Sequence, residues 1–380
     1  MDITTLKGIL NRKFGGANID EVQGISDYSL FQEAASFMMA EINPAETVRL
    51  GTLEVFADVY DYDPQNDLKE LVDLRPQTTR GVDDNLTRRY IEQFDQEKAN
   101  NDFAIEWRDG VKVLRYSRKV SGNIGVHDMD GLATNGTWSG TAANIALSDT
   151  NPYKGSGAIS ADYDTGEYIE NSDLTAVDLS DHENKSNLFL AAYFPDASLV
   201  TSIGLRWGSS STVYFSKTAT APQFGSFRNG WNLIPFAWNG ATETGTVDTE
   251  NIDYLRITYT GSSDTDIKFD NVFSALGQVR DILYYSNYLF RSTAGTWKAL
   301  PTADDDIINL DVDSENLFVY ECIRLIALQL QGREDVYTSY TNELYGTGQK
   351  VGMYDRYKSR KPNEAIVPQT RWRRFGYNHK

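Results

Sequence analysis

Cysteine is almost absent from this 380-residue sequence, and histidine is scarce. The single cysteine, Cys322, excludes a disulfide framework and any zinc site that is built on cysteines. The three histidines, His127, His182 and His379, lie far apart in the sequence. We therefore expect no catalytic triad and no metal centre that depends on several histidines.

Long hydrophobic runs and catalytic motifs are also missing. No stretch approaches the ~18 consecutive apolar residues of a membrane-spanning helix. The first residues, MDITTLKG, lack a basic segment followed by an apolar one, so we expect no signal peptide and synthesis in a cytoplasm. Residues 346–350 do not have the spacing of a phosphate-binding loop, and no pair of carboxylates can be assigned to sugar hydrolysis. We expect a protein that is not an enzyme and has no catalytic residues.

Charge is distributed unevenly along the chain. The formal net charge is −18, which argues against general binding to nucleic acid and gives no reason to expect a membrane partner. Residues 121–277 contain 19 Asp and Glu but only 7 Lys and Arg, whereas residues 350–380 contain 2 and 9. The sequence therefore has an acidic middle segment and a basic C-terminal tail.

The acidic middle segment has the pattern of a β-sandwich. Short alternating or apolar runs recur between turns rich in Gly, Ser, Thr, Asn and Asp, which is typical of antiparallel sandwiches. The predicted strands are Gly157–Tyr163, Asn187–Phe194, Ser202–Trp207, Thr212–Lys217, Trp231–Trp238, Ile252–Thr260 and Ile267–Phe273. No helix of three turns is predicted in this segment.

The flanking segments contain helices and hairpins. Apolar residues at helical spacing predict a helix over Asp27–Ile42, capped by Ser26 or Asp27, and Asn43-Pro44 predicts a second helix start. Residues 314–331 predict a helix that is apolar almost all round, which requires burial in a core or between subunits. Strands are predicted over residues 53–60 and 70–74, a hairpin over 102–116, and further helices over 334–344 and 351–358.

Together these patterns predict an α+β multidomain protein. Residues 1–122 and 278–350 form one helical domain with small β-hairpin and sheet elements, built from both chain ends, and 123–277 form an inserted all-β jelly-roll sandwich. Residues 351–380 form a basic, aromatic docking tail. The dense Arg and aromatic side chains of that tail fit a protein partner, and less well nucleic acid or a solvated end. The docking residues are Arg371, Trp372, Arg373, Arg374, Phe375 and Tyr377.

Four residues of the middle segment are candidates for ligand binding. Trp207 and Tyr214 lie on neighbouring predicted strands and either stack on a sugar or pack in the core. Asp270 is a candidate ligand of a structural calcium ion, because carboxylates and loop carbonyls are the oxygens that calcium prefers. His127, near Asp128 and Asp130, either helps to bind a metal or marks a polar domain boundary. No other cofactor is expected.

About residues 128–276 resemble the jelly roll of carbohydrate-binding modules. The resemblance is carried by short segments such as Leu205-Arg206-Trp207-Gly208, Gly230-Trp231-Asn232-Leu233 and Phe269-Asp270-Asn271-Val272. It implies a jelly-roll fold and possible glycan partners. Members of this family also serve as decoration or adhesion modules.

The flanking segments resemble structural proteins of tailed-phage virions, in particular head–tail connector (adaptor or neck) proteins. The resemblance rests on Tyr60-Asp61-Tyr62-Asp63-Pro64, on the region around Arg108-Asp109-Gly110, on 284–297, and on the 317–331 helix with its basic tail. It implies a structural subunit located in the virion that forms a homo-oligomeric ring, a dodecamer in this family. It also implies that the tail docks on the portal or another neck protein. The alternative is a carbohydrate-binding surface or adhesion protein, such as a tail fibre or capsid decoration, that uses the jelly roll.

Overall fold

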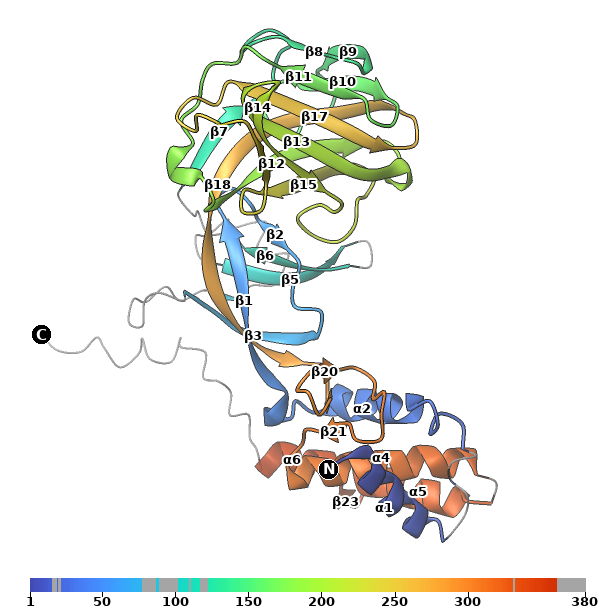
Figure 1. Cartoon of the computed structure of the whole chain (residues 1–380). Helices are drawn as coiled ribbons and strands as arrows, with labels where there is room; N and C mark the ends of the chain where they lie inside the picture. Colours follow the sequence, from blue (N-terminus) through green and yellow to red (C-terminus); the bar gives the residue numbers. More distant parts are fainter. Residues whose placement is uncertain are drawn as a thin grey trace, which may run out of the picture. The chain divides into compact units, whose positions relative to one another are not determined.

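The computed structural model describes residues 1–15, 19, 22–76, 87–88, 102–108, 111–116, 122–330 and 332–360. The chain divides into two compact units (Figure 1). Unit 1 comprises Met1–Thr52, Gln65–Pro76 and Asp281–Lys380, and unit 2 comprises Leu53–Pro64 and Gln77–Arg280. Among the described residues, no helix has both the length and the apolar character needed to cross a membrane.

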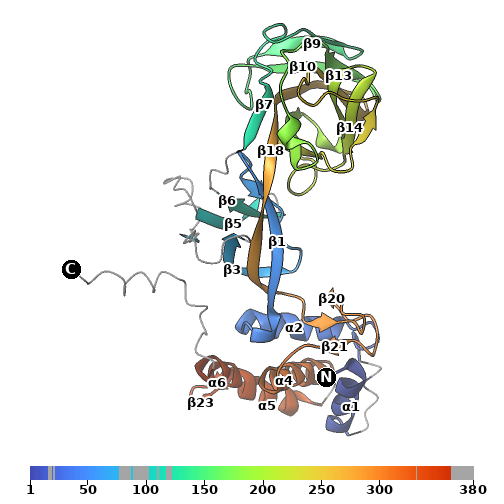
Figure 2. The ribbon, with the colours of Figure 1, turned by 60° about the vertical axis from the view of Figure 1, so that its left-hand side comes forward.

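Unit 1 contains the α-helices of the described chain. Helix α4 packs against helices from both ends of the sequence, and Figure 2 shows this group from another side. The helices are α1 (Ile3–Lys13), α2 (Ser29–Glu41), α4 (Val312–Gln329), α5 (Glu334–Tyr345) and α6 (Met353–Arg360). A three-stranded sheet and one strand pair accompany them. The sheet consists of β19 (Phe290–Arg291), β20 (Trp297–Lys298) and β21 (Ile307–Ile308), and the pair of β22 (Gly346–Thr347) and β23 (Lys350–Val351).

Helix α4 is buried by its own chain. Leu317, Phe318 and Ile326 belong to one hydrophobic core that also takes in residues of α1 and α2. Asp311 caps the helix by accepting a hydrogen bond from the Ser314 N–H at 2.8 Å, so the helix begins at Val312, two residues before the predicted start. Cys322 is buried in this core, and burial raises the pKa of its thiol. The apolar character of α4 is thus explained by packing within unit 1.

Two helix starts differ from the prediction. Helix α2 begins after Tyr28, which has the left-handed φ of 65°, and Asp27 accepts hydrogen bonds from the backbone and hydroxyl of Ser29. The second start, at Pro44, gives only the 3₁₀ turn η2 (Ala45–Thr47), because strand β1 (Val48–Phe56) begins directly after it. Helix α1 was not predicted, although Ile3, Leu6 and Leu10 bury one of its faces.

Unit 2 is built around a β-sandwich. Its strands are β7 (Asn123–His127), β8 (Trp138–Gly140), β9 (Ala143–Ser148), β10 (Ala158–Tyr163), β11 (Tyr168–Asn171), β12 (Ser186–Phe194), β13 (Val200–Ser210), β14 (Val213–Ala219), β15 (Gly230–Ala237), β16 (Thr242–Thr244), β17 (Tyr254–Gly261) and β18 (Asp264–Ser286). Every strand predicted in the middle segment is present. Strand β18 is far longer than predicted, because it continues past Gly277.

The sandwich consists of two sheets around one apolar core. The six-stranded sheet has the order β16-β14-β13-β17-β11-β8 and is antiparallel throughout. The larger sheet follows the path β15-β12-β18-β10-β9, with β7 also pairing with β18. Strands β1 and β3 (Leu68–Pro76) pair with β18 as well, but β3 and the end of β18 from Asp281 onward belong to unit 1. Leu190 and Phe236 from the larger sheet share the core with Leu205 and Ile257 from the six-stranded sheet.

A further small sheet completes unit 2. Its order is β2-β6-β5-β4, with β2 (Asp61–Tyr62), β6 (Val111–Tyr116), β5 (Asp102–Arg108) and β4 (Thr87–Arg88). The β5–β6 pairing confirms the hairpin that was predicted over 102–116.

The unit boundary therefore differs from the predicted domain boundary. Residues 53–64 and 77–122, which we assigned to the helical domain, belong to the unit that contains the sandwich. The reason is packing: Phe56 contacts Phe189 of β12 edge-to-face, with ring centroids 5.2 Å apart.

Candidate functional site

The outward face of the six-stranded sheet carries a mixed aromatic and charged surface. Ile203, Leu205 and Trp207 of β13 point into the core, so the intervening residues Gly204, Arg206 and Gly208 point outward. The same alternation on the neighbouring strands, fixed by the register, turns outward Tyr168 and Glu170 of β11, Tyr254, Arg256 and Thr258 of β17, and Tyr214 and Ser216 of β14.

Glu170 and Arg256 form a fixed ion pair at the middle of this face. The Arg256 Nε and Nη2 atoms both donate to Glu170 Oε2, at 2.8 Å and 2.6 Å. The Tyr254 hydroxyl donates to the same oxygen at 2.9 Å. Burial and this hydrogen bond to Glu170 raise the pKa of Tyr254, so it stays a neutral donor. The three side chains hold one another in a single geometry.

Two tyrosine rings flank the ion pair, and each has an arginine over it. The Arg256 guanidinium lies 3.9 Å from the Tyr168 ring centroid, and the Arg206 guanidinium lies 4.4 Å from the Tyr214 centroid. Both tyrosines are partly exposed. Tyr168 and Tyr214 stand on β11 and β14, which are separated by β17 and β13, or about 14 Å across the sheet. A ligand that touched both rings would extend across four strands.

Two glycines leave the outward side of β13 without side chains on either side of Arg206. At Gly208 a Cβ atom would come within 2.4 Å of the Val213 carbonyl oxygen, because β14 approaches closely at an irregularity in the register. At Gly204 a Cβ would have only ordinary contacts, the nearest at 3.5 Å from Thr258. On the outward side of β13, Arg206 is therefore the one large side chain between Gly204 and Gly208.

The outer face of the larger sheet is covered rather than open. Phe189 of β12 stacks on Phe273 of β18 at 5.2 Å, and Phe56 packs against Phe189 from outside. All three side chains are buried. A hydrogen bond from the Gly225 N–H to Asp63 Oδ1 at 2.9 Å ties a sandwich loop to the same covering segment. Within unit 2, packed side chains therefore cover much of the outer surface of this sheet.

Of the two aromatic residues predicted to bind sugar, the structure places only Tyr214 on the open face. Trp207 is fully buried, stacked on Phe215 at 5.9 Å and edge-on to Trp238 at 5.5 Å. Of the two roles left open for Trp207, its burial fits core packing and leaves no exposed ring face for a sugar. Trp231 lies on the outer side of β15 against Tyr153, whereas Trp238, just after the same strand, is buried in the core.

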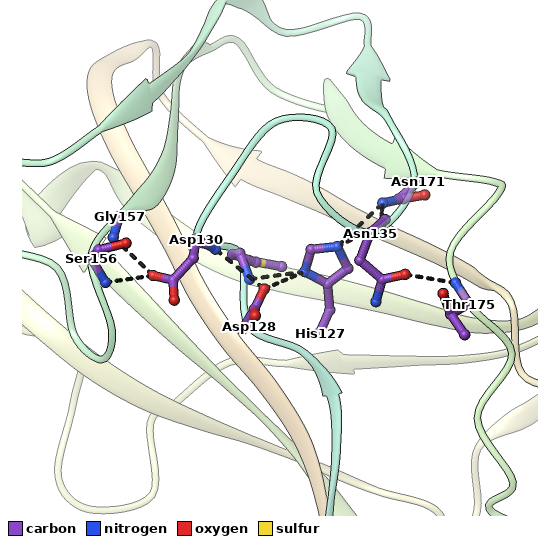
Figure 3. A network of polar contacts seen from close by, with 9 residues as sticks. His127, Asp128, Asp130, Asn135, Ser156, Gly157, Asn171 and Thr175 are labelled. Atoms are coloured by element: carbon purple, nitrogen blue, oxygen red, sulfur yellow. Dashed lines mark hydrogen bonds and ion pairs between the residues drawn. The ribbon is translucent and has the colours of Figure 1, made fainter.

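His127 belongs to a buried polar network at the start of the sandwich (Figure 3). Its Nδ1 accepts from the Met129 N–H at 2.8 Å, and its Nε2 lies 2.9 Å from the Asn135 carbonyl oxygen, to which it donates. Asn171 Nδ2 donates to the same carbonyl, at 2.8 Å. Burial lowers the pKa of His127, so the ring is neutral and both nitrogens are used within the fold. This arrangement fits a structural role and leaves no ring nitrogen for a metal.

Asp270, the candidate calcium ligand, is a buried carboxylate beneath a loop. Its Oδ2 accepts from the backbone N–H groups of Tyr153 and Lys154, at 2.8 Å and 2.9 Å. Its Oδ1 is buried without a hydrogen-bond partner, and burial raises the pKa of Asp270 to about 6. Asp130 holds the same loop, through the N–H groups of Ser156 and Gly157 (Figure 3).

A calcium ion at this loop stays a prediction. Asp270 Oδ1 is one oxygen that could serve a cation. However, no cluster of three or more His, Cys, Asp or Glu side chains within the described ranges is arranged to hold a metal ion. The backbone N–H groups around Asp270 and Asp130 already stabilise both carboxylates, so the loop is fixed by hydrogen bonds.

The predicted docking residues Arg371, Trp372, Arg373, Arg374, Phe375 and Tyr377 lie outside the described residues. Sequence reasoning also missed Tyr168, Glu170, Arg206 and Arg256. The alternating pattern around Arg256 was visible, but only strand pairing shows that its polar side meets residues about 50 and 86 positions earlier. The signal that could have found them is the phase of alternation: a buried Leu205 and Trp207 put Arg206 outside.

No protein-family model and no curated protein matches the sequence. Several solved structures are similar to it. A family 11 carbohydrate-binding module from Clostridium thermocellum, solved in complex with a β-1,3-1,4-mixed-linked tetrasaccharide, is 14% identical; the match covers 41% of this chain and 96% of the module, with a TM-score of 0.30.

Two further similar structures are a family 22 module and SGBP-B. The C-terminal family 22 carbohydrate-binding module of Clostridium thermocellum Xyn10B is 20% identical, over 40% of this chain and 92% of the module, at a TM-score of 0.24. SGBP-B from a xyloglucan utilization locus in Bacteroides uniformis is 8% identical, over 46% of this chain and 61% of that protein, at 0.27. The solved structures to which this chain is similar thus include carbohydrate-binding modules with a β-sandwich fold.

Proposed function

We propose that this protein binds a saccharide, without catalysis, on the outward face of its six-stranded sheet. The observation that supports it is the pair of partly exposed tyrosines, Tyr168 and Tyr214, on either side of the Glu170–Arg256 ion pair. Aromatic rings pack against the C–H faces of sugars, while Arg and Glu side chains exchange hydrogen bonds with hydroxyl groups.

Preorganisation favours this face over other surfaces of unit 2. The rings and the ion pair come from paired strands, and their positions are held by the hydrogen bonds among Glu170, Arg256 and Tyr254. Binding therefore costs little conformational entropy, because the side chains of the site are already ordered. The opposite sheet is closed by Phe56 and its neighbours, so a ligand of similar length would have to displace packed side chains there.

The test is retention of the full-length protein in gels that contain plant or bacterial polysaccharides, followed by titration with oligosaccharides. We expect Tyr168→Ala and Tyr214→Ala each to weaken binding about tenfold, because a ring contact contributes roughly 1.4 kcal/mol on this scale. Tyr153→Ala is the matched control: it removes an exposed tyrosine of the same unit that lies on the outer side of the larger sheet. The proposal is wrong if no polysaccharide retards the protein or if both face variants bind like the unchanged chain.

A second candidate is a structural subunit of a tailed-phage virion. In that case unit 2 would be a peripheral decoration on a head–tail connector ring. It is favoured by exposed apolar side chains of unit 1, which suit contacts between subunits: Leu50, Val312, Leu328 and Val351. In this proposal the subunit forms a ring of twelve copies, in keeping with the family resemblance, and docks on the portal or another neck protein. Analytical ultracentrifugation and electron microscopy of the purified chain decide the point, because a stable monomer contradicts it.

A further inference from the structure

Two arginines stand directly opposite each other on the saccharide face. Arg206 of β13 and Arg256 of β17 are partners in the antiparallel register, and both side chains point outward. Like charges at opposed positions of neighbouring strands destabilise a sheet. A group of opposite charge is therefore expected near each of them.

Only one of these arginines has such a group within the described chain. Arg256 is neutralised by Glu170, which lies opposite it on the next strand, β11. Arg206 has on its other side Ser216 of β14, which carries no charge. The Arg206 guanidinium has neither a hydrogen bond nor an ion pair with the described residues. It lies over the ring of Tyr214. Arg206 therefore presents its guanidinium N–H donors and a full positive charge at the open surface.

The surroundings of Arg206 make this charge accessible. Gly204 and Gly208 place no side chain beside it along β13, and the Arg206 side chain is partly exposed. Glu170 is two strands away, about 10 Å across the sheet, with Arg256 between them. A planar anion could thus approach the guanidinium edge while a sugar ring meets Tyr214.

We propose that the saccharide bound here carries an anionic group, a carboxylate or a sulfate, and that Arg206 is the residue that recognises it. This inference rests on the proposed function and narrows its substrate class. Long-range attraction does not explain the selection, because residues 121–277 carry far more acidic than basic side chains. Recognition therefore depends on direct, paired hydrogen bonds from Arg206 to the anion, which are stronger than bonds to neutral hydroxyls.

The experiment compares matched acidic and neutral sugars on the full chain. The probes are an oligogalacturonide with its carboxyl-reduced form, and a carrageenan oligosaccharide with its desulfated form. We expect the unchanged protein to bind one acidic probe at least tenfold more tightly than its neutral form. The pair that shows this preference identifies the anion as carboxylate or sulfate.

Variants assign the preference to one residue. Arg206→Gln should abolish the acidic preference, and Arg206→Lys should restore part of it, because lysine keeps the charge but not the paired donors. Lys185→Gln is the control: it removes one positive charge from an exposed position of the same unit and should leave the preference intact. Circular dichroism of each variant confirms that the fold is retained.

The outcomes separate the inference from the proposed function. Equal binding of acidic and neutral probes, still weakened by Tyr214→Ala, overturns the anionic class and leaves saccharide binding in place. A preference that survives Arg206→Gln also overturns the inference. The absence of binding to any probe or polysaccharide contradicts both.

Discussion

The buried charge cluster of unit 1 provides a sharp test of how this unit is stabilised. Glu321 of α4 is fully buried and accepts three hydrogen bonds: from Arg324 Nε at 2.7 Å, and from the hydroxyls of Tyr345 and Tyr354 at 2.8 Å and 2.7 Å. Burial and the negative charge of Glu321 raise the pKa of both tyrosines, so both stay neutral donors. The cluster ties α4 to α5 and α6.

Replacing Glu321 with Gln keeps the shape of the side chain and removes its charge. Arg324 then remains largely buried without a counter-ion, and its Nη2 atom already has no hydrogen-bond partner. Breaking a buried ion pair on one side costs about 3–5 kcal/mol. Because Gln can still accept a hydrogen bond from a tyrosine, we expect Glu321→Gln to lower the free energy of unfolding by about 3 kcal/mol.

Guanidinium unfolding, followed by the helical signal in circular dichroism, measures this loss, since the described α-helices all lie in unit 1. Glu33→Gln on the exposed side of α2 is the matched control and should change stability by less than about 0.5 kcal/mol. Removing both charges with Glu321→Gln and Arg324→Met should cost less than the sum of the single changes. A loss below about 1 kcal/mol for Glu321→Gln would refute the view that this pair holds the helices together.

Three further predictions concern single positions. Burial lowers the pKa of His127 and His182, so the unfolded chain takes up protons first, and these two groups should make stability fall as the pH drops below about 6.5. Thermal unfolding across that range measures this loss together with the opposite contribution of Asp270, whose pKa burial raises to about 6. Asp311→Ala removes the hydrogen bond to the Ser314 N–H and should cost about 0.5–2 kcal/mol in denaturant titrations, whereas an unchanged midpoint contradicts the capping role. Trp207→Ala should destabilise unit 2 by about 3–5 kcal/mol in unfolding followed by tryptophan fluorescence, and a fully stable variant would show that Trp207 is not a core residue.

The strands of the sandwich could be predicted because their signal is local. Alternation around Leu255 and Ile257 and the turn residues between runs depend only on neighbours in the sequence. The extension of β18 could not be predicted, because Gly277 interrupts the pattern. In the structure the position lies against a residue far away in the sequence: a Cβ there would meet the Glu54 carboxylate, and that side chain would have to move.

The residues of the proposed binding face could be predicted only in part. Residue type alone singled out Tyr214 and Trp207, but it ignores the phase of the strand, which turns Tyr214 outward and Trp207 into the core. The pairing of Glu170 with Arg256, and of Arg256 with Arg206, depends on which strands become neighbours. Sequence spacing does not fix that order, since non-local pairing is decided by the packing of the whole sandwich.

The connectivity of the sandwich leaves its six-stranded sheet without direct connections to unit 1. The chain enters through β7 and leaves through β18, which are antiparallel neighbours in the larger sheet. The strands of the six-stranded sheet, β8 to β17, all lie between these two points in the sequence, so none of them connects directly to unit 1. The larger sheet thus carries both chain connections and the Phe56 packing. Outward residues such as Arg206 and Tyr214 can consequently change without disturbing either, so substitutions on this face are expected to cost less stability than substitutions in the larger sheet.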